Sequence, residues 1–331
     1  MTTITSRVKR TSGVLCGALA LALAGSGTAA AQSTYPEPGK IVQIVVGSAA
    51  GSGQDLTARL VAQAFEKQFR GSRFQIVNKP GAGTQIAYQT IADAPADGYT
   101  FGILSLPNFA TLYLDKSRQA RFDLSSFKPI ANFIFDPGAI AVRAESPYKT
   151  FQDLITAAKA NPGKLTVAVG SPRGREHLDV IAVEQAADVT FTPIFHNDSG
   201  MALNTLLGGN VDAQQGSVGD FLTQIAAGRL RLLAVFAKEK SPFAPDVPTA
   251  ESFGFPIYSG VSRGFTFPAG VPDAMVQTLS DGIKQIVEAP DQQEKIKALG
   301  FQVRYMTAQE VTKYAQDEEA RIKELLSKIP K

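Results

Sequence analysis

Downstream of the N-terminal segment, the hydrophobic pattern predicts short strands and a helix. Residues 41–46 form a continuous apolar run, which is typical of a strand buried in a parallel sheet. Two further short runs, 74–77 and 99–104, stand beside turn residues and are also predicted to be strands. From Gln54 the apolar residues recur at helical spacing, so we predict a helix there. The expected buried face of this helix consists of Leu56, Leu60, Val61, Phe65 and Phe69.

The rest of the chain continues this alternation. The predicted strands are 130–135, 139–142, 165–169 and 230–236, and the predicted helices are 151–160, 177–187 and 202–207. Beyond Gly270 we expect mostly helix, and one amphipathic face there consists of Val276, Leu279, Ile283 and Ile286. Strands separated by helices at this spacing indicate an α/β protein with an open sheet.

The N-terminus has the layout of a secretory signal peptide. Arg7, Lys9 and Arg10 precede an apolar run at 14–24, and a cleavage site of small residues ends at Ala31. The apolar run is too short to cross a bilayer about 30 Å thick. We therefore predict secretion to the periplasm by a cleavable signal peptide; the alternative is an N-terminal anchor helix.

Charge and length constrain the mature chain. Removal of residues 1–31 would take away three of the 33 basic residues and none of the 30 acidic ones, so 300 residues with zero net charge would remain. A neutral chain has no broad electrostatic footprint for nucleic acid. The single cysteine, Cys16, lies in the predicted signal peptide, so the mature chain has no disulfide and no thiolate metal site. A length of about 300 residues indicates two lobes rather than one core.

Two Gly- and Ser-rich loops each join a predicted strand to a predicted helix. The first, residues 47–55, has small side chains, so a ligand can approach its main chain closely. The second, residues 170–176, adds Arg173 and Arg175, whose guanidinium groups can bind a carboxylate through two hydrogen bonds. Main-chain N–H groups at a helix N-terminus attract anions, and ligands of open α/β sheets bind beyond the carboxyl ends of strands. Both loops are therefore candidate anion-binding sites.

Each loop also has a plainer interpretation, which the sequence leaves open. Gly- and Ser-rich connections are often only tight turns with helix caps, and Asp55 can cap and orient its own helix instead of meeting a ligand. Arg173 and Arg175 can equally be solvated surface charges. Two such loops in what look like different lobes favour the binding interpretation.

The sequence contains no motif of a catalytic or metal centre. The patterns G-x-S-x-G, Walker A and H-E-x-x-H are absent. The two histidines, His177 and His196, lack convincing partners for a metal site, and Asp93 and Asp97 flank a turn that they more simply cap. We therefore expect a protein that is not an enzyme and that has neither a metal nor a cofactor.

Several short motifs follow one another in a characteristic order. Residues 49–55 with 58–59 are similar to a P-A-G-G-x-x-D…A-R pattern, and residues 78–83 to N-R-P-G-A-G. Residues 94–100 are similar to A-x-P-D-G-Y-T, and residues 206–212 to L-L-G-G-x-V-D. In this order and spacing, the motifs resemble those of the Bug-type periplasmic binding proteins of tripartite tricarboxylate transporters, along essentially the whole mature chain.

The resemblance implies a type II periplasmic-binding-protein fold, in which each of two lobes is an open mixed sheet flanked by helices. Lobe 1 would comprise residues 32–137 and 255–331, and lobe 2 residues 138–254. It also implies a solute-binding protein, expected to be a monomer, that captures a small organic carboxylate between the lobes and delivers it to the membrane subunits of a secondary transporter. Closure of the lobes would be the signal that the transporter reads. The alternatives are a ligand sensor subunit of a two-component system or a periplasmic hydrolase or isomerase.

This sequence departs from the family pattern near the expected cleft. Gly47 and Ser48 stand where Pro-Phe is usual, Arg173 and Arg175 stand where small residues are usual, and His196 takes the place of an aromatic residue. We predict that Arg173 or Arg175 selects a second carboxylate of the ligand, whose identity (dicarboxylate, tricarboxylate, aromatic acid or amino acid) stays open. The predicted ligand-binding residues are Ser48, Ala49, Ala50, Gly51, Ser52, Gly53, Asp55, Ser171, Arg173, Arg175, His196 and Ser217, with residues 215–217 as a third edge.

Overall fold

The structure is a computed structural model that describes residues 1–3, 35–196 and 199–327. The chain divides into an N-terminal unit, Met1–Thr34, and a compact unit, Tyr35–Lys331. All but the first three residues of the predicted signal peptide lie outside the described residues, so that prediction stays a prediction. No helix of the described chain has the length and apolar content needed to cross a membrane.

Strands of the compact unit join into one ten-stranded sheet, in the order β2-β1-β3-β9-β4-β7-β5-β6, with β8 and β10 also paired to β4. The strands are β1 (Ile41–Val46), β2 (Arg73–Asn78), β3 (Thr100–Leu106), β4 (Phe127–Arg143), β5 (Thr166–Val169), β6 (Thr192–Phe195), β7 (Ala213–Ser217), β8 (Leu230–Phe236), β9 (Gly260–Pro268) and β10 (Gln302–Thr307). The helices are α1 (Gly53–Gln68), α2 (Gln85–Ala92), α3 (Asn108–Leu114), α4 (Phe151–Ala160), α5 (Arg175–Ala187), α6 (Ser199–Leu207), α7 (Val218–Ala226), α8 (Asp273–Glu288), α9 (Pro290–Ala298) and α10 (Ala308–Ser327).

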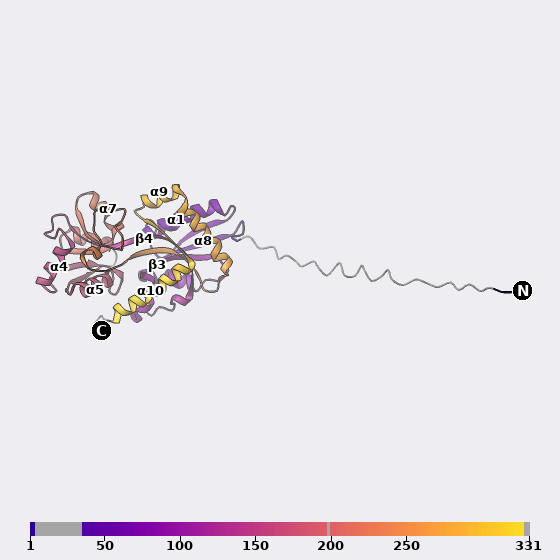
Figure 1. Cartoon of the computed structure of the whole chain (residues 1–331), viewed down its shortest axis with the longest axis horizontal. Coiled ribbons are helices and arrows are strands. Elements are labelled where there is room, and N and C mark those ends of the chain that lie inside the picture. Colours follow the sequence, from indigo (N-terminus) through magenta and orange to yellow (C-terminus); the bar gives the residue numbers. More distant parts are fainter. Residues whose placement is uncertain (4–34, 197–198, 328–331) are drawn as a thin grey trace. The chain divides into compact units, whose positions relative to one another are not determined.

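The long strand β4 belongs to both parts of the sheet (Figure 1). Its first part pairs antiparallel with β9 and β10, and its last part, from Gly138, pairs antiparallel with β7 and β8. We call β2, β1, β3, β9, β10 and the first part of β4 the first half-sheet, and β8, β7, β5, β6 and the last part of β4 the second half-sheet. Each contains parallel and antiparallel pairs, since β1 runs parallel to β2 and β3, and β5 parallel to β6 and β7.

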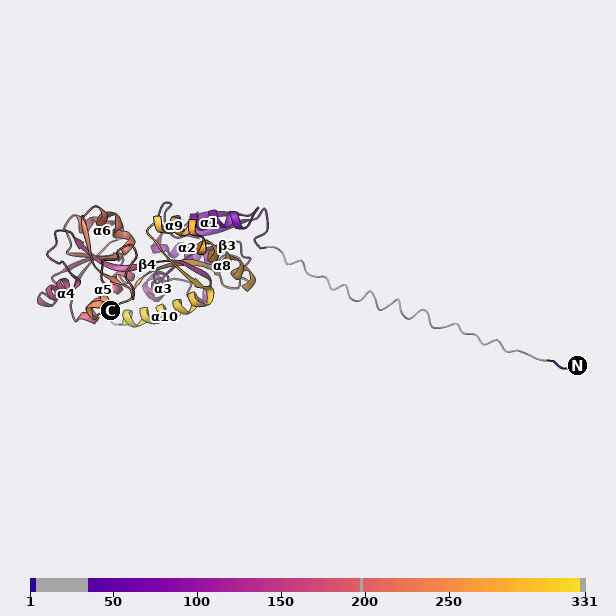
Figure 2. The same ribbon diagram turned by 45° about the horizontal axis from the view of Figure 1, so that its top comes forward.

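Helices cover both faces of each half-sheet. Alternate residues of a strand point to opposite faces, and apolar residues on both faces are buried against helices. In β1, Val42, Ile44 and Val46 enter a core with α1 and α8, while Val45 enters a second core with α2, α3 and α10. Figure 2 shows α1 and α9 on one side of the first half-sheet and α3 and α10 on the other. In the second half-sheet, α4 and α5 form one core and α6 and α7 the other.

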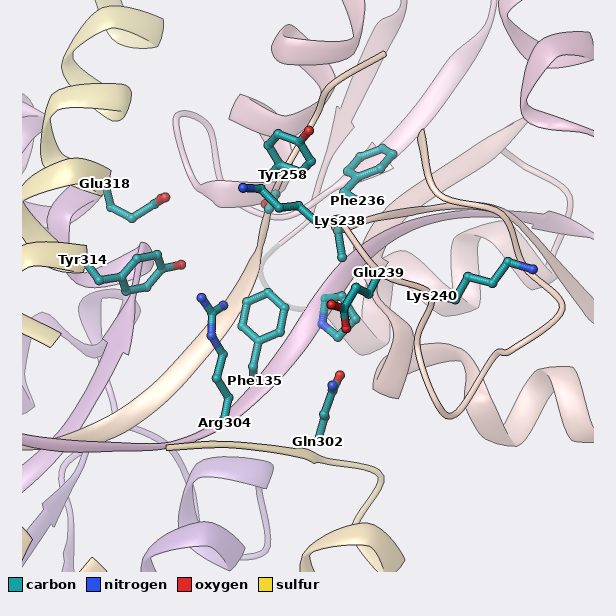
Figure 3. Close-up of a pocket in the computed structure, with 13 residues that line it drawn as sticks. Phe135, Phe236, Lys238, Glu239, Lys240, Tyr258, Gln302, Arg304, Tyr314 and Glu318 are labelled. Atoms are coloured by element: carbon teal, nitrogen blue, oxygen red, sulfur yellow. The ribbon is translucent and has the colours of Figure 1, made fainter. Parts of the chain in front are cut away.

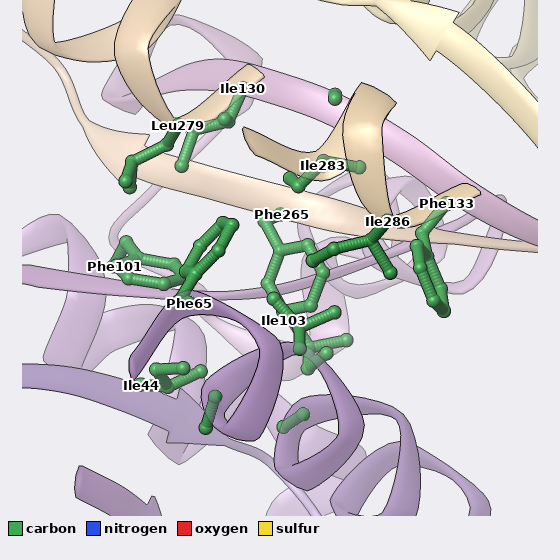
Figure 4. Close-up of a cluster of buried hydrophobic side chains, with 14 of the residues drawn as sticks. Ile44, Phe65, Phe101, Ile103, Ile130, Phe133, Phe265, Leu279, Ile283 and Ile286 are labelled. Carbon is green, nitrogen blue, oxygen red and sulfur yellow. The ribbon is translucent and has the colours of Figure 1, made fainter. Parts of the chain in front are cut away.

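Aromatic side chains fill the core between α1, α8 and the first half-sheet (Figure 4). Phe101 of β3 contacts Phe265 of β9, with ring centroids 5.7 Å apart, and Phe65 of α1, 6.5 Å away. The predicted face of α8 is confirmed, because its four apolar residues are all buried in this core. A core of this kind fixes the first half-sheet and so the ends of its strands, where the candidate loops begin.

Most predicted elements exist at nearly their predicted bounds, and the predicted α/β architecture is confirmed. The helix at Phe151–Ala160 begins where Thr150 accepts a hydrogen bond from the Asp153 N–H at 3.1 Å, a capping box that the sequence encodes locally. Leu56 was wrongly assigned to the buried face of α1, since it is exposed. The residue boundaries of the two predicted lobes stay a prediction.

One prediction about strands was wrong. Residues 130–135 and 139–142 belong to one strand, because Pro137 and Gly138 keep the backbone extended and pair with β9 and β7. Beyond Gly270 the described chain is mostly helical, as predicted, and the sequence analysis missed only β10 (Gln302–Thr307), which pairs antiparallel with β4.

Candidate functional site

The first loop, between β1 and α1, is held together by Asp55. Its carboxylate accepts a hydrogen bond from the Gly51 N–H at 2.9 Å and pairs with Arg59 at 2.7 Å. Burial acts to raise the pKa of Asp55, but the bonds from Arg59 and the Gly51 N–H outweigh it, so the pKa lies below its usual value. Ser52 caps α1 by accepting from the Asp55 N–H at 3.3 Å. Asp55 is only 1% exposed, so in this structure it organises the loop and the start of its helix.

The rest of the first loop lies against the start of α2. A Cβ atom at Gly47 would lie 2.7 Å from the Thr84 Cβ, so a larger residue at position 47 would push the two segments apart. The side chains of Ser48 and Ser52 hydrogen-bond each other at 2.5 Å and are half-buried, as is Gly53. The remaining predicted residues of this loop, which are exposed to solvent, are Ala49, Ala50 and Gly51.

The second loop reaches from β5 to α5 and carries Arg173 at its tip. Arg173 adopts a left-handed backbone conformation with φ of 60°, and its N–H donates to Nδ1 of His177 at 3.0 Å. Burial and the nearby Arg173 charge lower the pKa of His177, which favours the neutral ring that this bond requires. The Arg173 guanidinium lies 3.5 Å from the carboxylate of Asp115, directly after α3, and is 40% exposed. Arg173 thus spans from the second half-sheet to a helix of the first.

Arg175, the first residue of α5, is almost completely buried, with 2% of its surface exposed. Its Nη1 donates to Asp179 at 2.9 Å, and its Nη2 donates to Glu176 at 2.7 Å and to the Ser217 hydroxyl at 3.2 Å. The Asp179 carboxylate also accepts from Gln215 at 2.8 Å and from the Ser259 hydroxyl at 2.7 Å. Both terminal nitrogens of Arg175 are therefore used within the protein, which ties α5 to β7 and to the segment before β9.

The second loop forms one wall of a crevice of about 220 Å³. The opposite wall lies on the side of the first half-sheet and is formed by the segment before α2 and by α3. The lining residues are Gly83, Thr84, Asn108, Thr111, Leu112, Arg118, Gly170, Ser171, Gly174, Arg175, Glu176, Ser199, Ala202, Gln214 and Gln215. Gly174 and Thr84 are the N-cap residues of α5 and α2, and neither cap is made by a side-chain hydrogen bond. The first-turn residues Arg175 and Glu176 of α5 line the crevice without a capping side chain. Of α2, the N-cap residue Thr84 lines the crevice, and the Gln85 N–H donates to the Ala82 carbonyl oxygen.

The predicted site residues therefore fall into two sets. Ser171 and Arg175 line the crevice, and Ser217 lies directly behind it, buried, where it caps α7 and accepts from Arg175. His196 is half-buried and contacts Thr205 through Nε2 at 2.8 Å. His196, Arg173 and the predicted residues of the first loop are not among the lining residues. The second loop thus contributes to one wall of the crevice, while Gly47 of the first loop lies against Thr84 of the opposite wall.

Several crevice residues were missed in the sequence. Thr84 follows the turn at residues 78–83, whose motif resembles that of the family but did not by itself indicate a ligand site. Arg118 lies beyond a predicted strand, in a segment whose sequence shows no clear hydrophobic pattern. Its side chain is 24% exposed, and its Nε lies 3.9 Å from the Asp115 carboxylate, which makes a weak ion pair. Gln214 was missed because the polar sequence AQQGS of β7 does not indicate a buried strand, whereas Gln215 belongs to the predicted third edge at residues 215–217. Among the missed residues, only Thr84 had a signal, which is the turn motif before it.

A cluster of buried charges lies behind the crevice. Asp136 of β4 accepts a hydrogen bond from the Gly219 N–H at 3.1 Å. Burial and the neighbouring Asp220 carboxylate raise the pKa of Asp136 to about 7, against the opposing effect of Arg263 and Arg175. Arg263 stacks on the ring of Phe301 at 4.9 Å, and its buried Nε and Nη1 have no hydrogen-bond partner within the described chain.

A larger cavity of about 380 Å³ lies near the point where β4 passes between the half-sheets (Figure 3). Arg304 there stacks on Phe135 at 4.8 Å and faces Tyr314 at 5.6 Å, while Lys238 faces Tyr258 at 5.5 Å. None of the predicted site residues lines it, and no helix begins there. We therefore take the smaller crevice, which is lined by the first turn of α5 and by the N-cap residue of α2, as the candidate anion site. Among the described residues, no group of His, Cys, Asp or Glu side chains could hold a metal ion.

Comparison with protein families gives one match over most of the chain. Residues 57–330 match the model of the tripartite tricarboxylate transporter family receptor. A relative in Cupriavidus necator, the UPF0065 protein in the gbd 5′ region, is 29% identical over 96% of this chain and 95% of its own length.

Solved structures show the same fold. A TctC solute-binding protein from Polaromonas, without ligand, is 26% identical and superposes with a TM-score of 0.77, covering 89% of this chain and all of that one. The R. palustris protein Rpa4515, solved with adipate, is 25% identical with a TM-score of 0.77, over 88% of this chain and 97% of that one. The two-walled crevice therefore occurs in a fold that is shared with solute-binding proteins.

Proposed function

Because this chain belongs to the tripartite tricarboxylate transporter receptor family, as its motifs indicated, we propose that it is a periplasmic receptor that binds a small organic carboxylate in the crevice and delivers it to the membrane subunits of a transporter. The proposal includes the ligand class, the crevice as its site and the delivery step. The neighbour solved with adipate supports a dicarboxylate as the first ligand to test.

The observation that carries the proposal is that the first turn of α5 lines the crevice opposite Thr84, the N-cap residue of α2. The α5 N-terminus lies on the side of the second half-sheet and the α2 N-terminus on the side of the first. Main-chain N–H groups at such ends are partly positive and can hold a carboxylate without a charged side chain. Both terminal nitrogens of Arg175 are engaged within the protein, while its buried Nε has no partner within the described chain. The groups that remain for an anion therefore include main-chain donors, Arg118 and this Nε.

Binding can be tested on the purified mature protein by thermal unfolding and titration calorimetry. We expect adipate, succinate or citrate to raise the unfolding temperature, because a ligand at 100 times its Kd stabilises the folded state by about 2.7 kcal/mol. The uncharged diamide of adipic acid serves as the matched control and should have no effect. Failure of every di- and tricarboxylate to bind would refute the proposal.

The site can be tested with Gly174→Ala. A Cβ at this position would lie 2.9 Å from the Ser171 carbonyl oxygen, so the second loop must shift and affinity should fall by about tenfold or more, on the order of 1.4 kcal/mol. Unchanged affinity would place the ligand elsewhere. Delivery is tested by uptake of labelled ligand in cells that lack this protein, where uptake should fall and return with the wild-type chain.

A further inference from the structure

Two buried glutamines of β7 present unused acceptors at the crevice. Gln214 is 0% and Gln215 is 1% exposed, and both line the crevice. The Oε1 atom of each is buried and has no hydrogen-bond partner within the described chain. Leaving such an oxygen unpaired costs about 1–3 kcal/mol, so each one calls for a donor from water or from a ligand.

The orientation of both amides follows from their nitrogen atoms. The Gln215 Nε2 donates to the Asp179 carboxylate at 2.8 Å, and the Gln214 Nε2 donates to the Ser199 carbonyl oxygen at 3.4 Å. A carboxylate or a carbonyl can only accept, so turning either amide over would set two acceptors against each other. The free atom of each glutamine is therefore an oxygen, which needs a donor.

A third acceptor lies on the opposite wall. Asn108, the first residue of α3, also lines the crevice, and its Oδ1 is buried without a partner in the described chain. A carboxylate carries no proton at neutral pH and cannot serve these oxygens, so a ligand that has carboxylates alone would leave them to water. A hydroxyl or ammonium group on the ligand would supply the missing donor.

We infer that the crevice selects carboxylates that also carry a hydroxyl or amino group, with Gln214 and Gln215 as the acceptors for that group. This inference rests on the proposed function, since it places the carboxylate at the helix N-termini and the donor group at β7. Gln214 and Gln215 are successive residues of β7, so their side chains point to opposite faces of the sheet, Gln215 toward Asp179 of α5 and Gln214 toward Ser199 of α6. One donor group on the ligand therefore reaches one of the two oxygens.

The test compares ligands that differ in one group. Calorimetry is run with succinate, malate and aspartate, and with adipate, 2-hydroxyadipate and 2-aminoadipate. In at least one series, the hydroxy or amino member should bind the wild-type protein about tenfold more tightly than the plain diacid. This affinity ratio corresponds to one buried hydrogen bond of about 1.4 kcal/mol. Equal affinities throughout would show that water alone serves the glutamines, and would overturn the inference while leaving the proposed function intact.

Variants assign the effect to the residues. Gln214→Met or Gln215→Met should reduce the preference, taken as the ratio of the two affinities measured on the same variant, to less than about threefold. Gln224→Met is the matched control, because the Gln224 Oε1 is also buried and unpartnered in the described chain but does not line the crevice. A preference that survives in both β7 variants, or falls equally in the control, would refute the inference. If no diacid of either series binds at all, the inference falls together with the proposed function.

Discussion

Replacing Asp136 by Asn should stabilise the protein at alkaline pH and leave it unchanged at acidic pH. The carboxyl group is 4% exposed, and its pKa rises from 3.8 to about 7 because burial and Asp220 disfavour the charged form more than Arg263 and Arg175 favour it. The folded protein therefore holds a proton that the unfolded chain releases near pH 4. The stability from this group is full below about pH 4 and is lost as the pH rises through about 7.

The magnitude follows from the size of the shift. A rise from 3.8 to about 7 corresponds to roughly 4 kcal/mol at 1.36 kcal/mol per unit, so Asp136→Asn should gain up to that amount at about pH 8.5. Asn keeps an oxygen to accept from the Gly219 N–H. Urea unfolding followed by circular dichroism between about pH 4 and pH 8.5 measures the difference, with the exposed Asp246→Asn as the control.

The reasoning about Asp136 would be refuted by a variant that is less stable than the wild type at about pH 8.5. That result would mean that Arg263 and Arg175 stabilise the ionised carboxylate in the folded protein more than burial and Asp220 disfavour it, so that its pKa is not raised. A difference that is constant across the pH range would also contradict it, since it would reflect packing rather than ionisation. The buried Asp179, whose pKa is raised to about 6, stays in place in both proteins, so part of the pH dependence should remain in the variant.

Three further substitutions test the packing around the site by urea unfolding. Arg175→Met should destabilise the protein by about 3–5 kcal/mol, because it leaves the Asp179 carboxylate buried without its partner. The control, Arg73→Met at an exposed position, should leave the free energy of unfolding nearly unchanged, and equal effects of the two substitutions would contradict the buried pair. Ser52→Ala should cost about 1 kcal/mol through loss of the α1 cap, and no loss would argue against that cap. Phe265→Ala should cost about 3–5 kcal/mol because this ring is fully buried in the core between α1, α8 and the first half-sheet, and a cost below about 1 kcal/mol would refute its place in the core.

The sequence predicted those elements whose signals are local. The apolar run at Ile41–Val46, the capping box at Thr150 and the face of α8 each depend on neighbouring residues, and each is present in the structure. Strands with polar residues were missed, since they are stabilised by distant partners. In β9, Ser262 is fully buried because its hydroxyl bonds to Asn132 at 2.7 Å, a residue 130 positions away.

The same limit applies to the site. The second loop was found because a strand followed by small residues and a helix start is a local pattern, and this loop does line the crevice. The burial of Arg175 could not be foreseen, because its neighbour Asp179 is bound by Gln215 and Ser259, from segments far along the chain. The opposite wall at Thr84 and Asn108 is likewise a product of the tertiary fold.

The two arginines that depart from the family pattern serve contacts within the protein in this structure. Arg175 joins α5 to β7 through its hydrogen bond to Ser217. Arg173, in the second loop, pairs with Asp115, which follows α3 on the side of the first half-sheet. A guanidinium that already has carboxylate partners gains little from a ligand carboxylate, because the ligand would have to replace bonds of similar strength. Under the proposed function, main-chain N–H groups and Arg118 would bind the anion, and the acceptors of Gln214 and Gln215 would discriminate between ligands. The contacts of Arg173 and Arg175 would then fix the second loop, and the neutral groups of the crevice wall would choose the ligand.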